Sequence, residues 1–128
     1  MAAQCRALRR AAFMVQKEVG QRLAATPGNR HYGGLSVWVQ SYWKPRMEFT
    51  VGPGAFSPPP RVDSAVLSFD PLPPERLPSH PGSLARLIRL FFQQRRKQLG
   101  GIARRAPWPG VAEALEAAGI DARLRPEQ

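Results

Sequence analysis

Apolar and polar positions follow different periods in the two halves of the chain. In the first half, residues 11–15 form a short apolar run that predicts a buried strand. Residues 16–25 then predict a helix, which stops at the turn-forming sequence 26–29. No neighbouring strand is evident for residues 11–15, so we expect an open apolar edge there, which invites aggregation.

The segment 35–43 fits two periods. Leu35, Val37 and Val39 alternate with other residues as in a strand. Leu35, Val39 and Tyr42 fit one face of a helix equally well. The pattern alone leaves both structures open.

Two further apolar runs predict a β-hairpin. Residues 47–51 read as a strand that ends at the glycines and proline of residues 52–54. Residues 65–69 read as a second strand. The loop between them is rich in proline, which is tolerated outside a sheet ladder, so we expect the two strands to pair.

The second half has helical spacing. Residues 70–82 hold five prolines in thirteen positions and no apolar period, which is typical of a linker. Ser83 is a suitable N-cap for a helix. Apolar residues then recur at helical spacing at Leu84, Leu87, Ile88, Phe91, Leu99 and Ile102. We expect Gly100 and Gly101 to end or bend this helix, and Pro109 to open another.

The composition predicts a polyanionic partner. The chain has 128 residues, within the range of one domain, and a hydrophobic content of 43%, which is enough for a core. Its net charge is +10, and arginine supplies 16 of the 19 basic residues. The planar guanidinium suits phosphate, so nucleic acid is the first candidate partner. A GC-rich genome would explain the ratio of arginine to lysine, but not the net charge.

The strongest basic cluster lies between residues 86 and 105, and no acidic residue occurs from 77 to 112. Its members are Arg86, Arg89, Arg95, Arg96, Lys97, Arg104 and Arg105. On one continuous helix, Arg86, Arg89, Arg96 and Lys97 would lie opposite the apolar stripe. A solvated helix face is the alternative, but such faces usually mix both signs of charge. We therefore expect these residues to contact phosphate.

Several other chemistries find no support in the sequence. Cys5 is the only cysteine, and with two distant histidines, His31 and His80, it cannot form a zinc site. Asp63 and Ser64 have no nearby histidine for a catalytic triad. No apolar run approaches the length needed to span a membrane.

A proline-braced aromatic residue is the most informative local feature. Phe56 precedes Ser57 and the three prolines 58–60, which fix three backbone φ angles in a row. Such a stiff segment beside the end of a strand can hold an aromatic ring where a flat ligand stacks. The alternative is that Phe56 fills the core beneath a polyproline-like loop.

These segments together resemble the ribosomal RNA adenine dimethyltransferases, a family that includes the macrolide-resistance methylases. Residues 56–64 are similar to the family's Phe-x-Pro-x-Pro-x-Val-x-Ser motif. Residues 14–19 are similar to its Gln-Lys-Glu-Val segment, and residues 32–37 to its Tyr-Gly-x-Leu-Ser-Val segment. Residues 92–99 resemble its Phe-x-x-Arg-Arg-Lys-x-Leu helix. Four such matches in the family's order make the resemblance specific.

The resemblance implies an α/β fold: the C-terminal part of a Rossmann-like methyltransferase sheet, followed by a small α-helical domain. It favours a helix for the ambiguous segment 35–43. It also implies that residues 1–70 end the catalytic domain, that residues 71–83 are a proline-rich linker, and that residues 84–128 are part of a helical RNA-binding domain.

The resemblance also implies a chemistry. Members transfer methyl groups from S-adenosylmethionine to adenine amines of small-subunit ribosomal RNA, with the target base turned out and clamped by aromatic rings. By resemblance, Phe56 is one such ring, and Arg61 beside it is a backbone anchor. The family's Glu-x-Gly-x-Gly donor loop and its Asn-Leu-Pro-Tyr motif do not occur in this chain. We therefore expect a fragment that is inactive alone, with the cofactor site in an N-terminal half.

The expected partner is small-subunit ribosomal RNA or a pre-ribosomal subunit, bound by a cytoplasmic monomer without membrane contact. The basic start, with Arg6, Arg9 and Arg10, is also a feature of transit peptides. The resemblance begins by Ala12, however, and leaves little room for a presequence. Two alternatives stay open: a non-catalytic basic module that binds RNA or the ribosome, and a truncated gene product.

Overall fold

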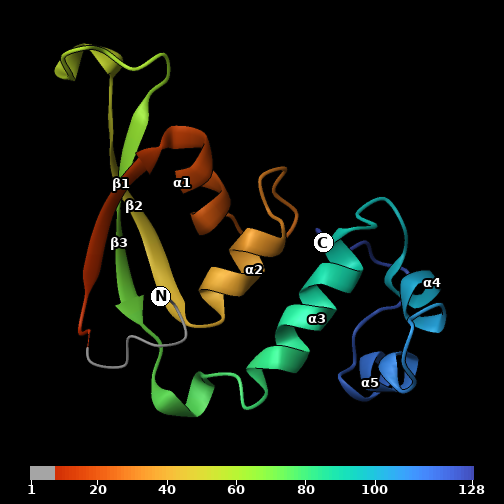
Figure 1. Ribbon diagram of the computed structural model, residues 1–128. Coiled ribbons are helices and arrows are strands. Elements are labelled where there is room, and N and C mark those ends of the chain that lie inside the picture. Colours follow the sequence, from red (N-terminus) through yellow and green to blue (C-terminus); the bar gives the residue numbers. More distant parts are fainter. Residues whose placement is uncertain (1–7) are drawn as a thin grey trace.

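A three-stranded antiparallel sheet forms one end of the molecule (Figure 1). The computed structural model describes residues 8–128, so the expectations for Cys5 and Arg6 lie outside it. The central strand β3 (Ser64–Pro71) pairs with β1 (Ala11–Gln16) on one side and with β2 (Trp43–Val51) on the other. Central position explains why Ala65 and Leu67 of β3 are fully buried.

Two short helices cover one face of this sheet: α1 (Lys17–Ala24) and α2 (Gly34–Gln40). Leu23 of α1 packs with Tyr42, Trp43, Leu67 and Phe69 in the main core. Gly20 allows α1 to approach the sheet closely, because a Cβ atom at that position would lie 2.9 Å from Cδ1 of Leu67. The core therefore rests on a tight contact between helix and sheet.

Polar side chains join α1 to α2. Ser36 is fully buried, accepts a hydrogen bond from the backbone N–H of Gly33 (3.1 Å), and donates its own hydroxyl to the carbonyl of Arg22. Gln40 donates to the carbonyls of Leu23 and Ala25, both at 2.8 Å. These bonds satisfy carbonyl groups at the end of α1, which a helix leaves without internal partners.

No described helix covers the other face of the sheet (Figure 1). Met14, Val66 and Phe49 stand in register across this face, on β1, β3 and β2 respectively. Met14 is 54% exposed and Phe49 is 57% exposed. At one end of the same face, Asp70 accepts hydrogen bonds from Arg10 (2.7 Å) and Arg46 (3.0 Å).

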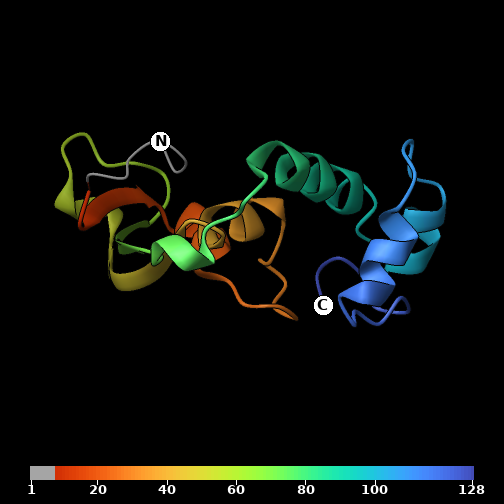
Figure 2. The ribbon, with the colours of Figure 1, turned by 90° about the horizontal axis from the view of Figure 1, so that it is seen from below.

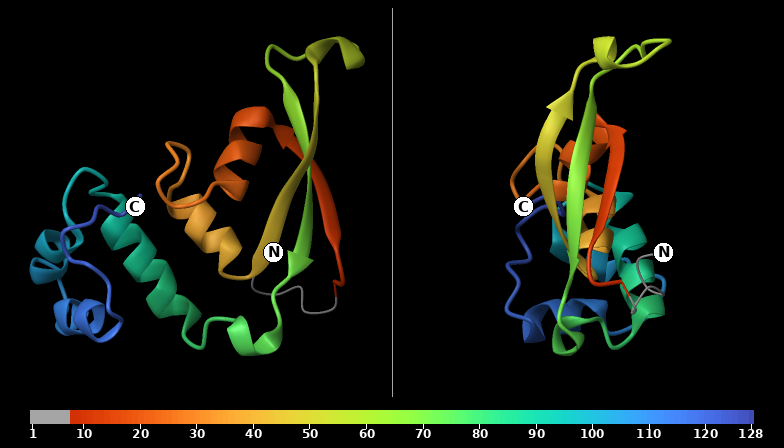
Figure 3. Two further views of the ribbon diagram at one scale, coloured as in Figure 1. Left: turned by 180° about the vertical axis from the view of Figure 1, so that it is seen from behind. Right: turned by 90° about the vertical axis from the view of Figure 1, so that its left-hand side faces the viewer.

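The second half of the chain is helical. A connection with one short 3-10 turn (Pro74–Arg76) leads from β3 to α3 (Pro81–Phe92), which lies beside α2. The helices α4 (Leu99–Arg104) and α5 (Val111–Ala117) pack on each other beyond α3, so the molecule is elongated (Figure 2). Figure 3 shows the same order from behind, with the sheet at one end and α4 and α5 at the other.

The expectations for the first half are confirmed in outline. A strand occupies residues 11–16 and a helix follows it at once, but the expected burial of this strand is wrong, because Phe13 and Met14 are exposed at an edge of the sheet. The ambiguous segment is helical up to Gln40, but Trp43 already belongs to β2, which is longer than expected. The expected hairpin is formed. The expectation that the first strand lacks a neighbour is wrong, because β1 pairs along its whole length with β3.

The expectations for the helical half need three corrections. The helix after the linker begins at Pro81 with His80 as N-cap, not at Ser83. It ends at Phe92, and residues 93–98 form turns, because six polar residues in succession offer no apolar face to bury. Gly100, Gly101 and Pro109 do not bound a helix as expected: the two glycines lie within α4, and α5 begins at Val111, after Gly110 with a φ of 88°.

Candidate nucleic-acid interface

The predicted target-base residue lies in the loop between β2 and β3, which projects beyond the end of the sheet (Figure 1). Phe56 follows the 3-10 turn Pro53–Ala55, and its backbone N–H donates to the carbonyl of Pro53 at 3.2 Å. The far end of the loop is fixed where the N–H of Lys17 donates to the carbonyl of Asp63 at 2.9 Å. The loop is therefore held at both ends while its tip projects from the fold.

The surroundings of Phe56 bear on the choice between a stacking ring and a core residue. Phe56 is half-buried, and it does not belong to the hydrophobic cluster around Leu67 or to the residues packed against that cluster. Arg61 on the same loop is exposed, as are the three prolines between them. The loop thus carries a ring and a cation five positions apart, both outside the main core.

Two of the predicted phosphate contacts lie on α3. Arg86 and Arg89 are exposed and are three positions apart, so they share one side of the helix. The guanidinium of Arg86 lies 4.4 Å from the ring centroid of Trp108. This cation–π contact joins α3 to the loop before α5, so Arg86 has an internal partner as well as an exposed surface.

The turn after α3 carries three more of the predicted residues, and the structure separates them. Arg95 donates from Nη2 to the carbonyl of Tyr32 at 2.9 Å, and its Nε lies 3.6 Å from Oε2 of Glu127. Arg96 and Lys97 are exposed and make no side-chain hydrogen bond or ion pair with any residue in 8–128. The expected common helix face for Arg86, Arg89, Arg96 and Lys97 is wrong, because the last two lie beyond the helix.

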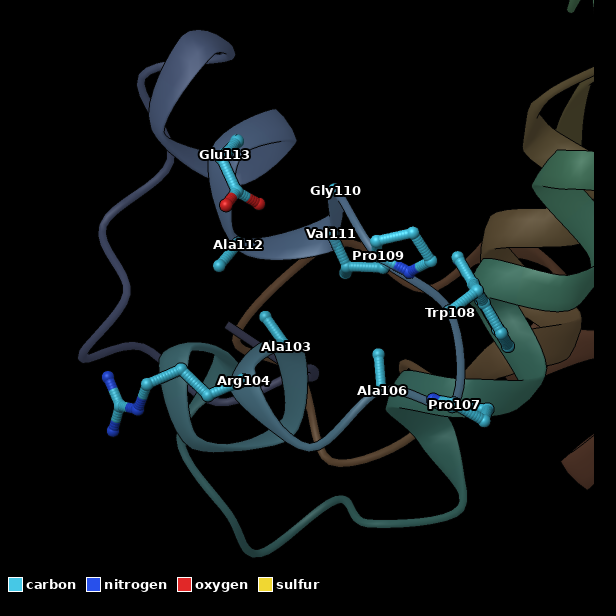
Figure 4. Close-up of a pocket in the computed structure, with 10 residues that line it drawn as sticks. All are labelled: Ala103, Arg104, Ala106, Pro107, Trp108, Pro109, Gly110, Val111, Ala112 and Glu113. Carbon is cyan, nitrogen blue, oxygen red and sulfur yellow. The ribbon is translucent and has the colours of Figure 1, made fainter.

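The last two predicted residues end α4. Arg104 is the final residue of that helix and Arg105 follows as its C-cap; both are exposed. A cavity of about 480 Å³ opens beside them, between the end of α4 and the start of α5 (Figure 4). Trp108 lies on one side of this cavity, and the side chain of Arg104 extends on the opposite side. The helix dipole favours cations at a helix C-terminus, so the positive charges of Arg104 and Arg105 stabilise the end of α4 while they stay exposed.

Acidic side chains neutralise few of these cations. Among the described residues, the ion pairs join Asp70 to Arg10 and Arg46, Glu18 to Arg22, Asp121 to Arg123, and Glu127 to Arg95. Of the predicted phosphate contacts, only Arg95 takes part in one of these pairs. Within the cluster 86–105, five others also have no described aromatic partner. They lie on α3, on the turn after it and at the end of α4, and are called the cationic surface below: Arg89, Arg96, Lys97, Arg104 and Arg105.

Two groups with perturbed pKa values are the carboxyl of Asp70 and the phenol of Tyr32. The hydrogen bond from Arg10 lowers the pKa of Asp70, and the charges of Arg10, Arg46 and Lys44 lower it further. Burial raises the pKa of the Tyr32 phenol. The residues described include no cluster of three metal-ligating side chains, and no described helix is long and apolar enough to cross a membrane. The described residues of the interface therefore offer charge and aromatic surface.

The sequence patterns missed three residues that the structure brings into the interface. Trp108 lies between two prolines, and this isolated aromatic in a rigid segment was the available signal. Tyr32 takes part through its backbone carbonyl, and Glu127 through its carboxylate, with no local signal in the sequence for either contact.

Comparison with known proteins decides the family. The model of the family described as "Ribosomal RNA adenine dimethylase" matches residues 2–123. The chain belongs to this family. The description agrees with the resemblance drawn from the four motifs, and the order of these motifs places the chain in the C-terminal part of the family's sequence.

Curated relatives in the dimethylase family are about twice as long as this chain. The "Ribosomal RNA small subunit methyltransferase A" of Oleidesulfovibrio alaskensis is 50% identical over 95% of this chain, which spans 44% of that relative. The protein of the same name from Nitratidesulfovibrio vulgaris is 51% identical over 94% of the chain and 45% of its own length. The chain thus spans less than half the length of these relatives.

Solved structures agree on the fold. A dimethyladenosine transferase from Plasmodium falciparum superposes with a TM-score of 0.79 at 24% identity, over 95% of this chain and 54% of that one. A 23S rRNA methyltransferase superposes with a TM-score of 0.65 at 19% identity, over 96% of this chain and 50% of that one. The α/β fold predicted from the sequence is therefore confirmed as the fold of part of an rRNA methyltransferase.

Proposed function

We propose that this chain supplies the RNA-binding side of an S-adenosylmethionine-dependent adenine N6-dimethyltransferase that acts on small-subunit ribosomal RNA. The observation that carries the proposal is the cationic surface, whose side chains lack acidic partners among the described residues. In a family of rRNA adenine dimethylases, phosphate is the partner that such a surface suits. Monomeric state and a cytoplasmic location stay predictions, as does the division into a catalytic end, a linker and a helical RNA-binding domain.

The Phe56 loop suits the target base. The exocyclic amine of adenine is a poor nucleophile because its lone pair is conjugated with the ring, so the reaction depends on positioning the base outside the RNA stack. An aromatic ring on a rigid loop stabilises a turned-out base by about 1–3 kcal/mol. Arg61 lies on the same loop and is exposed, so it can contact the phosphate next to the target nucleotide.

The methyl donor does not fit the residues present. The chain contains no Glu-x-Gly-x-Gly sequence. Four cavities of the described residues, around α3, α4 and α5, are open hollows at the surface. We infer that S-adenosylmethionine binds residues outside this chain. Calorimetric titration of the 128-residue protein with the cofactor should show no binding, and micromolar binding would contradict this inference.

The cationic surface is tested by the salt dependence of RNA binding. If about four of its residues touch phosphate, the slope of log K against log salt should be roughly −3 to −4. The double variant Arg96→Gln/Lys97→Gln should flatten the slope by about 1.4–1.8. Arg123→Gln is the matched control, because Arg123 is exposed but already paired with Asp121. An equal slope in the double variant and the parent would place the RNA surface elsewhere.

The stacking role of Phe56 needs an active enzyme. A chimera in which residues 8–128 replace the corresponding part of the Nitratidesulfovibrio vulgaris relative provides one. Phe56→Ala should then reduce methyl transfer far more than RNA affinity, because the ring touches one base and phosphate contacts supply most of the affinity. Phe56→Tyr, which keeps the ring, should retain turnover. Full turnover with Phe56→Ala would mean that Phe56 only fills space.

A further inference from the structure

Residues 121–128 cross from the helical half back to the first half of the chain. The carbonyls of Ala122 and Leu124 accept hydrogen bonds from the N–H groups of Gly100 (2.9 Å) and Leu99 (2.8 Å) at the start of α4. A few residues later, the carbonyl of Glu127 accepts from the N–H of Gly28 at 2.8 Å, in the loop between α1 and α2. One segment therefore bonds to both halves, and Figures 1 and 2 show its end beside that loop.

Arg95 lies where this segment meets the first half. Its Nη2 donates to the carbonyl of Tyr32 (2.9 Å), and its Nε faces the carboxylate of Glu127 (3.6 Å). The rigid fork of a guanidinium can serve two acceptors at once, which a lysine ammonium on the same stem does less well. Arg95 thus connects three pieces of chain: the turn after α3, the α1–α2 loop and the segment 121–128.

Half-buried side chains make the contact between α2 and α3, because α3 contains no fully buried residue. Tyr32 meets Phe92 edge to face, with ring centroids 6.2 Å apart. A Cβ atom on Gly34 would lie 3.2 Å from Cγ2 of Ile88 and 3.6 Å from Cβ of Phe92, which shows that α2 and α3 approach closely there. The bonds around Arg95 add a polar link beside these apolar contacts.

We propose that Arg95 is a positioning residue and not a phosphate ligand, and that it fixes the cationic surface relative to the Phe56 loop through Tyr32 and Glu127. A phosphate would have to displace a carbonyl and a carboxylate from Arg95, whereas the adjacent Arg96 and Lys97 have no such partner among the described residues. The expected effect on RNA binding rests on the proposed function. The joint, which is the set of contacts of Arg95 with Tyr32 and Glu127, does not.

The joint is tested by amide hydrogen exchange at Gly28, followed by NMR in the 128-residue protein. Arg95→Gln should raise this exchange rate about tenfold. The segment that carries the Glu127 carbonyl is then no longer held by Arg95, so the hydrogen bond from Gly28 opens more often. Glu127→Gln should raise it less, because an amide oxygen at that position can still accept from Arg95, and Arg95 keeps its bond to the Tyr32 carbonyl. Arg95→Lys should give an intermediate rate. Arg96→Gln is the matched control and should leave Gly28 unchanged, and exchange at Leu67 should be unchanged in every variant.

RNA binding separates positioning from phosphate contact. Arg95→Gln should lower affinity by a similar factor at every salt concentration, so that its salt plot runs parallel to that of the parent. Arg96→Gln should flatten the plot by about 0.7–0.9. Unchanged Gly28 exchange in Arg95→Gln, or a flattening in Arg95→Gln equal to that in Arg96→Gln, would overturn the proposal. A parent slope near zero would refute the RNA surface, and the Gly28 result would still decide the joint.

Discussion

The two halves of this chain are stabilised in different ways. The α/β half, residues 11–71, buries Leu23, Tyr42, Trp43, Leu67 and Phe69 in one continuous cluster around a central strand. The helical half, residues 81–128, has Ile102, Ala103, Val111 and Pro126 as its buried apolar side chains, and α3 has none. A well-packed scaffold therefore carries the projecting Phe56 loop, whereas the cationic surface lies on a helical half with few buried side chains.

The largest effect should come from the core of the α/β half. Leu67→Ala should lower the free energy of unfolding by about 2–5 kcal/mol, because a fully buried leucine leaves a cavity in a central strand. Urea denaturation followed by circular dichroism measures it. Leu35→Ala, at a residue that is 43% exposed, should cost less than about 0.5 kcal/mol. Equal losses from the two changes would mean that the core of this half is not where the structure places it.

A smaller loss is expected where α1 approaches the sheet. Gly20→Ala should cost about 1–2 kcal/mol, although alanine favours a helix, because the new methyl group would meet Cδ1 of Leu67 at 2.9 Å and Cβ of Ala65 at 3.2 Å. The double variant Gly20→Ala/Leu67→Ala should recover part of that loss, and thermal unfolding of the four proteins gives the coupling. Strict additivity would show that the two positions do not touch.

Two adjacent glycines test the helical half in opposite directions. Gly100→Ala should destabilise by about 1–2 kcal/mol, since its Cβ would lie 2.9 Å from Cβ of Ala122 and 3.3 Å from the Ala122 carbonyl. Gly101→Ala should stabilise by about 0.5–1 kcal/mol, because nothing lies within 4 Å of a Cβ there and alanine favours the helix. Chemical denaturation of both variants decides the matter: effects of the same sign would contradict the path of residues 121–128 beside α4.

The smallest effect concerns acid stability. Arg10 and its neighbours lower the pKa of Asp70 in the folded state, so the contribution of Asp70 is present above the unfolded pKa of about 3.9 and disappears as the pH falls through the folded value. Asp70→Asn should therefore be less stable than the parent at neutral pH and should converge with it in strong acid. Because these groups are exposed, the difference should shrink with added salt. A constant difference at every pH would exclude titration of Asp70 as the cause.

The sequence predicted the first half well because local pattern and tertiary burial agree there. Alternating apolar residues in β3 and the turn residues of the hairpin lead to one sheet. In the helical half, Leu99 and Ile102 continued the helical phase of α3, and this hid the break at residues 93–98. Local sequence pattern could not predict the contacts of Arg95. Its partner Tyr32 lies 63 residues before it, and its other partner, Glu127, lies far after it in the chain.

The elongation of the molecule carries a consequence for selectivity. The Phe56 loop projects from the sheet at one end, and α4 and α5 lie at the other (Figure 2). A short single strand that occupies one of these places does not reach the other. Under the proposed function, an RNA that engages both would have to present its target nucleotide and its anchoring duplex at a fixed separation. Selection would then operate on the three-dimensional shape of an assembled RNA, and the nucleotide sequence would matter only through the shape it specifies.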